Sequence, residues 1–217
     1  MNETEWLACD DPDELLAALR GTVSDRKVRL FAIAVTRHSP NLVAYEELEQ
    51  AVDCGERMID GPVQKAELIA ARDAVAWGIG EMCESLNRLS EVIDVILRPQ
   101  AVDTASAREV IRCVSSIHLL SEQDATGREG YPEQCEIVRD IFGNPFRPAA
   151  LEPHWLTATV RDLAGAIYAE RAYDRLPILA DALEDAGCDD ADILAHCRGD
   201  GPHVRGCWAL DLILGKQ

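Results

Sequence analysis

Apolar residues recur at three- and four-residue steps along almost the whole chain, which is the spacing of one face of an α-helix. The segment 63–97 is the longest example, with apolar positions at this spacing from Leu68 to Ile96. No long window alternates apolar and polar residues as a half-buried strand would. We therefore predict an all-α fold, an irregular bundle of about eight or nine helices, with helix pairs at both ends long enough for helical-hairpin repeats.

Capping signals set the ends of several predicted helices. Asp11 and Pro12 are typical of an N-cap and a first helical position, and Ser24 is typical of a second N-cap. Asp189 is expected to cap a short helix, and Gly201 followed by Pro202 is expected to start the last one. The helical pattern covers ten segments, slightly more than the eight or nine helices expected, at residues 12–20, 24–38, 44–58, 63–97, 104–120, 133–141, 153–171, 174–186, 190–197 and 201–214.

Residues 121–132 are rich in Ser, Asp, Thr and Gly and end in Pro132, a composition typical of an exposed loop. We take this stretch as the boundary between an N-terminal helical unit, residues 1–120, and a C-terminal helical unit, residues 133–217. The two units could also pack as one domain.

Composition and charge narrow the function classes. The chain has 217 residues, 47% of them hydrophobic, and its 39 acidic against 21 basic residues give a net charge of −18. Such a charge repels nucleic acids and anionic membranes and suits a partner protein with a basic surface. The acidic start and the lack of an apolar run of about 20 residues predict a cytoplasmic protein. Eight cysteines are then expected as reduced thiols.

Long phrases at both ends of the chain carry a family resemblance. They are Thr4–Cys9, Ser24–Lys27, Arg139–Pro148 (RDIFGNPFRP), Asp174–Cys188 (DRLPILADALEDAGC) and His196–Trp208 (HCRGDGPHVRGCW). In these phrases the chain resembles a bacterial family of uncharacterised proteins, often present in many copies per genome, some of them linked to regulatory interaction domains. The family has no established activity, so the resemblance implies none. Residues 33–38 depart from it, because the family tends to have paired cysteines and arginines there.

Five potential metal ligands lie close together near the C-terminus: Cys188, His196, Cys197, His203 and Cys207. Thiolate and imidazole are the ligands that zinc prefers. The favoured set is Cys188, Cys197, His203 and Cys207, with His196 as a substitute, and His203 and Cys207 would share one face of the last helix. The alternative, which we prefer, is that the cysteines are small buried hydrophobes and the histidines bind loop carbonyls. No cofactor is then needed.

The pair Arg112 and His118 is a second candidate for chemistry. Arg112 and His118 have the spacing used by a family of helical ribonucleases, in which the histidine activates a ribose hydroxyl and the arginine holds the phosphate. Six residues along a helix place them on different faces, and the acidic charge disfavours RNA. The four tryptophans, Trp6, Trp77, Trp155 and Trp208, are expected as core anchors, with one or two as interface residues instead.

The interpretation that follows is a non-catalytic protein-interaction or regulatory module with an acidic surface. Its expected contact residues are Phe146, Arg147, His203 and Arg205, which lie in loops between short capped helices. The alternatives are a zinc-stabilised helical domain that uses the C-terminal Cys/His cluster and a helical RNA nuclease that uses Arg112 and His118. The sequence predicts no oligomeric state.

Overall fold

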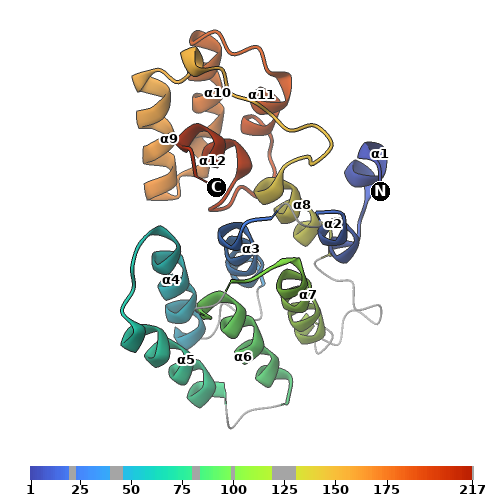
Figure 1. Cartoon of the computed structure of the whole chain (residues 1–217), viewed down its shortest axis with the longest axis vertical. Coiled ribbons are helices and arrows are strands. Elements are labelled where there is room, and N and C mark those ends of the chain that lie inside the picture. Colours follow the sequence, from blue (N-terminus) through green and yellow to red (C-terminus); the bar gives the residue numbers. More distant parts are fainter. Residues whose placement is uncertain (20–22, 40–45, 80–83, 99–100, 119–130, 217) are drawn as a thin grey trace. The chain divides into compact units, whose positions relative to one another are not determined.

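The computed structural model describes residues 1–19, 23–39, 46–79, 84–98, 101–118 and 131–216, and for 78–79, 84–89 and 115–118 it describes the backbone alone. Within these residues the chain forms twelve α-helices, two short 3-10 helices and no strand (Figure 1). The predicted all-α class is therefore confirmed, although the helices are more numerous than the eight or nine expected. No helix in this part of the chain is long and apolar enough to cross a membrane.

The chain divides into two compact units. The central unit is the continuous stretch 8–135, and the terminal unit combines residues 1–7 with residues 136–217. This differs from the predicted division at 121–132, a stretch of which 121–130 lie outside the described residues. The first residues join the terminal unit because Arg139 donates to the Trp6 carbonyl at 2.9 Å and the Trp6 ring meets Phe146 edge-on at 6.4 Å.

The central unit is built around one buried helix, α3, which contacts α4, α6 and α7. All nine residues of α3 from Val28 to Thr36 are buried. The predicted caps Asp11 and Ser24 are confirmed, since their side chains accept hydrogen bonds from backbone amides at the starts of α2 and α3. The helices of this unit are α2 (Pro12–Ala18), α3 (Asp25–Arg37), α4 (Glu46–Asp60), α5 (Lys65–Ile79), α6 (Glu84–Leu97) and α7 (Thr104–His118).

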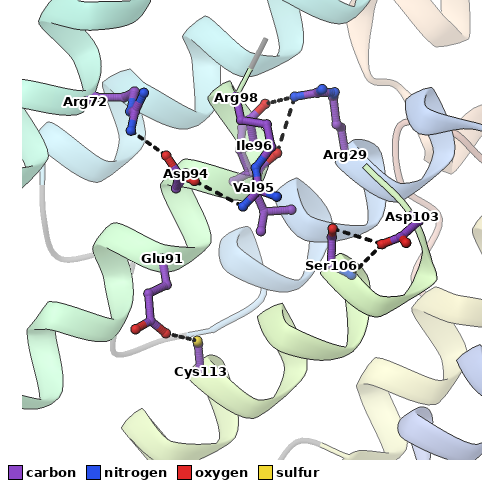
Figure 2. A network of polar contacts seen from close by, with 10 residues as sticks. All are labelled: Arg29, Arg72, Glu91, Asp94, Val95, Ile96, Arg98, Asp103, Ser106 and Cys113. Carbon is purple, nitrogen blue, oxygen red and sulfur yellow. Dashed lines mark hydrogen bonds and ion pairs between the residues drawn. The ribbon is translucent and has the colours of Figure 1, made fainter. Parts of the chain in front are cut away.

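Arg29 ties α3 to the end of α6. Its buried guanidinium donates to the carbonyls of Val95 and Ile96 at 3.3 and 2.8 Å, as Figure 2 shows. Carbonyls in the last turn of a helix have no partner within that helix, so a cation there satisfies them and favours the helix dipole. Asp25 balances the charge from the other side, at 2.8 Å from the Arg29 Nε.

Further polar contacts in Figure 2 join neighbouring helices of the same unit. Arg72 of α5 forms an ion pair with Asp94 of α6. The Cys113 thiol of α7 donates to Glu91 of α6 at 3.1 Å. The Arg72–Asp94 ion pair lies at the surface and adds little to stability by itself, whereas the Cys113 side chain is buried.

In the terminal unit, α9, α10, α11 and α12 pack around one apolar core. The core residues come mainly from α9, α10 and α12, with Ile193 and Cys197 from α11. The elements of this unit are α1 (Glu3–Ala8), α8 (Tyr131–Phe142), a 3-10 helix (Pro153–Trp155), α9 (Ala158–Glu170), a second 3-10 helix (Tyr173–Arg175), α10 (Leu176–Asp185), α11 (Ala191–Cys197) and α12 (Trp208–Leu214). The unit boundaries fall within α1 and α8.

Several predicted helices differ from the observed ones. The segment 63–97 forms two helices, α5 and α6, and residues 80–83 between them lie outside the description. The segment 153–171 begins as a 3-10 turn, and α9 starts only after the N-cap Thr157. The last helix starts at Trp208 and not at Gly201, because Gly206 has a φ of +98°, which a right-handed helix does not accommodate.

Gly55 on α4 provides a test of the packing in the central unit. A Cβ added there would lie 2.3 Å from the Ile96 Cγ2 on α6. We expect Gly55→Ala to lower the free energy of unfolding by about 1–3 kcal/mol, because overpacking displaces buried side chains. Gly165→Ala on α9 is the matched control, since its Cβ meets nothing within 4 Å and the change should stabilise by about 0.5–1 kcal/mol. Urea denaturation of both variants measures the difference, and equal destabilisation would contradict this account.

Asp25 predicts a pH dependence in the same unit. Partial burial acts to raise the pKa of Asp25, but hydrogen bonds from Arg29 and the Val102 amide outweigh it and lower that pKa. A lowered pKa in the folded state stabilises the fold above the ordinary carboxyl value, and this stabilisation disappears as the pH falls below about 4. The unfolding free energies of the wild type and Asp25→Asn should therefore converge with falling pH. A constant difference from pH 7 to pH 3 would contradict the prediction, and Asp73→Asn serves as the exposed control.

Candidate functional site

Four polar side chains converge in the terminal unit. The carboxylate of Asp140, one ring nitrogen each of His196 and His203, and the thiol of Cys207 all lie within 4.8 Å of one another. We call these four residues the Asp140 cluster. Three of them, His196, His203 and Cys207, belong to the Cys/His group identified in the sequence, while Asp140 does not.

Separate elements bring the four side chains together. Asp140 lies in the last turn of α8, His196 lies near the end of α11, and Cys207 is the N-cap of α12. His203 lies in the loop between α11 and α12, so the expected sharing of one helix face with Cys207 is wrong. A loop with a turn at Gly206 replaces the predicted helix, and in it His203 contacts Asp140 while Cys207 lies within the same cluster.

Asp140 is the centre of the hydrogen bonding. Its Oδ1 accepts from His203 Nδ1 at 2.8 Å and lies 3.3 Å from His196 Nε2, and its Oδ2 accepts from the Val204 amide at 3.0 Å. Burial acts to raise the pKa of Asp140, but the bonds from His196 and His203 and the Val204 amide outweigh it and lower that pKa. The carboxylate is therefore ionised although the residue is buried.

His203 supplies the opposite charge. Its Nδ1 faces the Asp140 carboxylate and its Nε2 faces the Gly199 carbonyl at 3.2 Å. Both partners are acceptors, so both ring nitrogens carry a proton. Burial acts to lower the pKa of His203, but the hydrogen bond and charge of Asp140 raise it overall. Asp140 and His203 thus form a buried ion pair.

His196 is held by a tryptophan. The Trp208 indole N–H donates to His196 Nδ1 at 3.1 Å, and the two rings lie 4.8 Å apart. An indole nitrogen only donates, so Nδ1 is unprotonated and the neutral ring carries its proton on Nε2. That proton points to the Cys207 Sγ at 3.1 Å and the Asp140 carboxylate at 3.3 Å.

The three cysteines of this region lie in the core. Burial raises the pKa of Cys207 well above its ordinary value, and the Asp140 charge adds to the effect. Burial likewise raises the pKa of Cys197 to about 12 and raises that of Cys188. Cys188 and Cys197 are part of the apolar core and lie outside the Asp140 cluster. All three are thiols at neutral pH in this geometry.

The expected partner-binding residues have different surroundings. Phe146 is exposed, and Arg147 forms ion pairs with Glu3 at 3.1 Å and Asp192 at 3.4 Å. Arg205 lies 4.5 Å from the centroid of the Tyr168 ring. His203 is largely buried in the Asp140 cluster, so it contributes little to an outer surface.

The residues proposed for RNA cleavage lie on α7. Arg112 is exposed and pairs with Glu109 at 2.6 Å. The His118 side chain lies outside the described part of the chain, so the structure gives no geometry for the pair. Nearby, Glu91, Glu109 and Cys113 form a second group of potential ligands. The thiol already donates to Glu91, and no other observation indicates a ligand there.

Sequence reasoning missed Asp140 and Trp208 as parts of the site. Asp140 carried a usable signal, because it lies among the buried positions Ile137, Val138 and Ile141 of an amphipathic helix. A carboxylate on such a face requires a buried donor. Trp208 follows Cys207 directly, and only the turn at Gly206 brings its ring onto His196.

A second candidate site is an exposed face of α5 in the central unit. Ala66, Ile69, Ala70, Asp73 and Trp77 are all exposed and recur at three- and four-residue steps, so they share one face. Trp77 is 90% exposed and Ile69 is 47% exposed. We call these five residues the α5 face. Trp77 therefore differs from the expected core anchors Trp6 and Trp155, which are buried.

Comparison of the chain with family models, with curated proteins and with solved structures finds no match. The interpretation of the Asp140 cluster and of the α5 face therefore depends on their geometry and chemistry.

Removal of the Asp140 charge tests whether the cluster organises the terminal unit. We expect Asp140→Asn to cost about 3–5 kcal/mol of unfolding free energy, because it leaves the His203 cation buried without its partner. Asp162→Asn is the control, since Asp162 on α9 is exposed and should change stability by less than about 0.5 kcal/mol. Chemical denaturation followed by tryptophan fluorescence measures both. Similar small effects in the two variants would show that the ion pair is dispensable.

Proposed function

We propose that this protein acts by binding another protein with a basic, amphipathic surface, and that the α5 face is the contact. The observation that carries the proposal is the exposure of Trp77, 90% of whose surface is open to solvent. A monomeric protein seldom exposes a large aromatic side chain beside other apolar residues unless the patch binds something. Tryptophan is also among the residues most enriched at the energetic centres of protein interfaces.

The α5 face has the shape and chemistry of a helix-binding surface. Ile69 and Trp77 are two turns apart, and the small side chains of Ala66 and Ala70 leave room for a partner helix to approach. Asp73 lies between Ile69 and Trp77 on the same face and is exposed. A cation of the partner opposite Asp73 would fix the register of the complex.

Charge favours a basic partner over a second copy of this chain. The net charge of −18 makes self-association costly at low salt. Helix α4 contacts α5, and the first turn of α4 presents Glu46, Glu47 and Glu49 to solvent. Lysine and arginine on a partner would meet these carboxylates, which raises the association rate.

The loop residues Phe146, Arg147 and Arg205 remain a secondary proposal for partner contact in the terminal unit. Phe146 and Arg147 are exposed at adjacent positions in the loop after α8. The ion pairs of Arg147 with Glu3 and Asp192 would have to open for it to bind a partner.

Binding of two designed peptides tests the proposal. One is an amphipathic helix of leucine and lysine, and the other has the same apolar face but glutamate in place of lysine. We expect the lysine peptide to bind the full chain, to bind more weakly as salt rises, and to lose about tenfold or more in affinity with Trp77→Ala. Fluorescence anisotropy of labelled peptides gives the affinities.

Ile178→Ala is the matched control, because Ile178 on α10 is also an exposed apolar side chain, 56% open to solvent. Its removal should leave the affinity unchanged. Equal binding of the lysine and glutamate peptides, or an unchanged affinity in Trp77→Ala, would contradict the proposal.

A further inference from the structure

We infer that the Asp140 cluster is a binding site for a single Zn²⁺ ion, held by Asp140, His196, His203 and Cys207. Four ligand atoms, one oxygen, two nitrogens and one sulfur, lie within 4.8 Å of one another. Zinc takes this mixture of ligands in tetrahedral sites. The site concerns the terminal unit and is independent of the α5 face.

The distances are close to those that zinc requires. The bond lengths of zinc to oxygen, nitrogen and sulfur place the ligands of a tetrahedron about 3.3–3.6 Å apart. In the structure, His196 Nε2 lies 3.3 Å from Asp140 Oδ1 and 3.1 Å from Cys207 Sγ, and His203 Nδ1 lies 2.8 Å from Asp140 Oδ1. Small outward shifts of side chains that already face one another would open the centre for the ion.

The outer contacts of His203 and Asp140 suit ligation. The His203 Nε2–H donates to the Gly199 carbonyl, which orients the ring with Nδ1 toward the centre. The Val204 amide holds Asp140 through Oδ2 and leaves Oδ1 directed at the other ligands. Such outer hydrogen bonds are typical of metal-binding histidines and carboxylates, because they fix the ligand in place.

Zinc entry also conserves the charge of the buried site. Without metal, the site holds one carboxylate, one imidazolium, one neutral imidazole and one thiol, with a net charge of zero. When Zn²⁺ binds, His203 loses the proton on Nδ1 and Cys207 loses its thiol proton, and both protons pass to solvent. The two charges of Zn²⁺ replace the two protons that leave. The net charge of the site therefore stays zero, and little additional charge is desolvated.

Trp208 is a contact that opposes zinc. Ligation through His196 Nε2 requires the ring proton to move to Nδ1, and there it would meet the indole N–H of Trp208 at 3.1 Å. The indole must therefore turn away when the ion binds. The two nitrogen ligands and the sulfur ligand favour zinc over calcium or magnesium, which prefer oxygen ligands.

Metal titration of the full chain tests the inference. We expect one Zn²⁺ per chain by isothermal calorimetry, and Co²⁺ in its place should give a thiolate charge-transfer band and the strong visible bands of tetrahedral cobalt. Cys207→Ala should weaken zinc binding by at least about 100-fold and abolish the charge-transfer band. Cys197→Ala is the matched control, because Cys197 is equally buried but lies outside the cluster.

Two results would overturn the assignment. One is wild-type protein that takes up no stoichiometric zinc. The other is loss of zinc in Cys197→Ala with retention in Cys207→Ala, which would favour the set Cys188, Cys197 and His203 instead. Circular dichroism of the variants establishes that each is folded before its affinity is compared.

Trp208→Phe tests the role of His196 separately. It removes the indole N–H that opposes ligation while keeping an aromatic ring, so zinc binding should strengthen by up to about tenfold. Weaker binding in Trp208→Phe than in the wild type would exclude His196 as a ligand in the proposed tautomer.

Discussion

The buried carboxylate of Asp140 is the interaction on which the terminal unit depends. It joins α8 to the segment between α11 and α12, two parts of the chain more than fifty residues apart. The loop that carries His203 and Val204 has little regular structure, and hydrogen bonds to Asp140 hold it. A group with this burial and charge is stable only when every donor around it is in place, so it also specifies one arrangement of its neighbours.

Each unit contains a buried charged side chain that binds polar groups of a distant segment. In the central unit a buried cation, Arg29, satisfies the carbonyls at the end of α6 and is balanced by Asp25. In the terminal unit a buried anion satisfies two imidazoles and a backbone amide. Both contacts join segments far apart in the sequence, and each places a charge where helix ends or loops leave polar backbone groups without partners.

Local signals predicted much of the fold, and long-range contacts account for most of what they missed. The N-caps Asp11 and Ser24 and the helical class followed from spacing and residue type alone. The break at Gly206 did not, because it depends on the three-dimensional arrangement of the loop, in which Val204 binds both Asp140 and the Cys207 amide. The spacing did not identify which tryptophans are exposed, because α5, which carries Trp77, has apolar residues on more than one face, so periodicity does not identify the buried face.

The Asp140 cluster, too, could be predicted only where its residues are close together in the sequence. The sequence identified His196, His203 and Cys207 by their proximity along the chain, but Asp140 lies on another helix. Spacing also suggested Cys188 and Cys197, whose thiols instead fill the apolar core. No rule about neighbours in the sequence connects Trp208 to the tautomer of His196, because that effect requires the geometry of the turn.

The division of the chain has a consequence for its synthesis. Residues 1–7 leave the ribosome before the segment they pack against, which begins only at residue 136. The whole central unit is translated in between and is continuous, so it can fold while the chain is still growing. Trp6 therefore lacks its contacts with Arg139 and Phe146 until more than a hundred further residues have been translated, and the terminal unit is complete only after α12 has emerged.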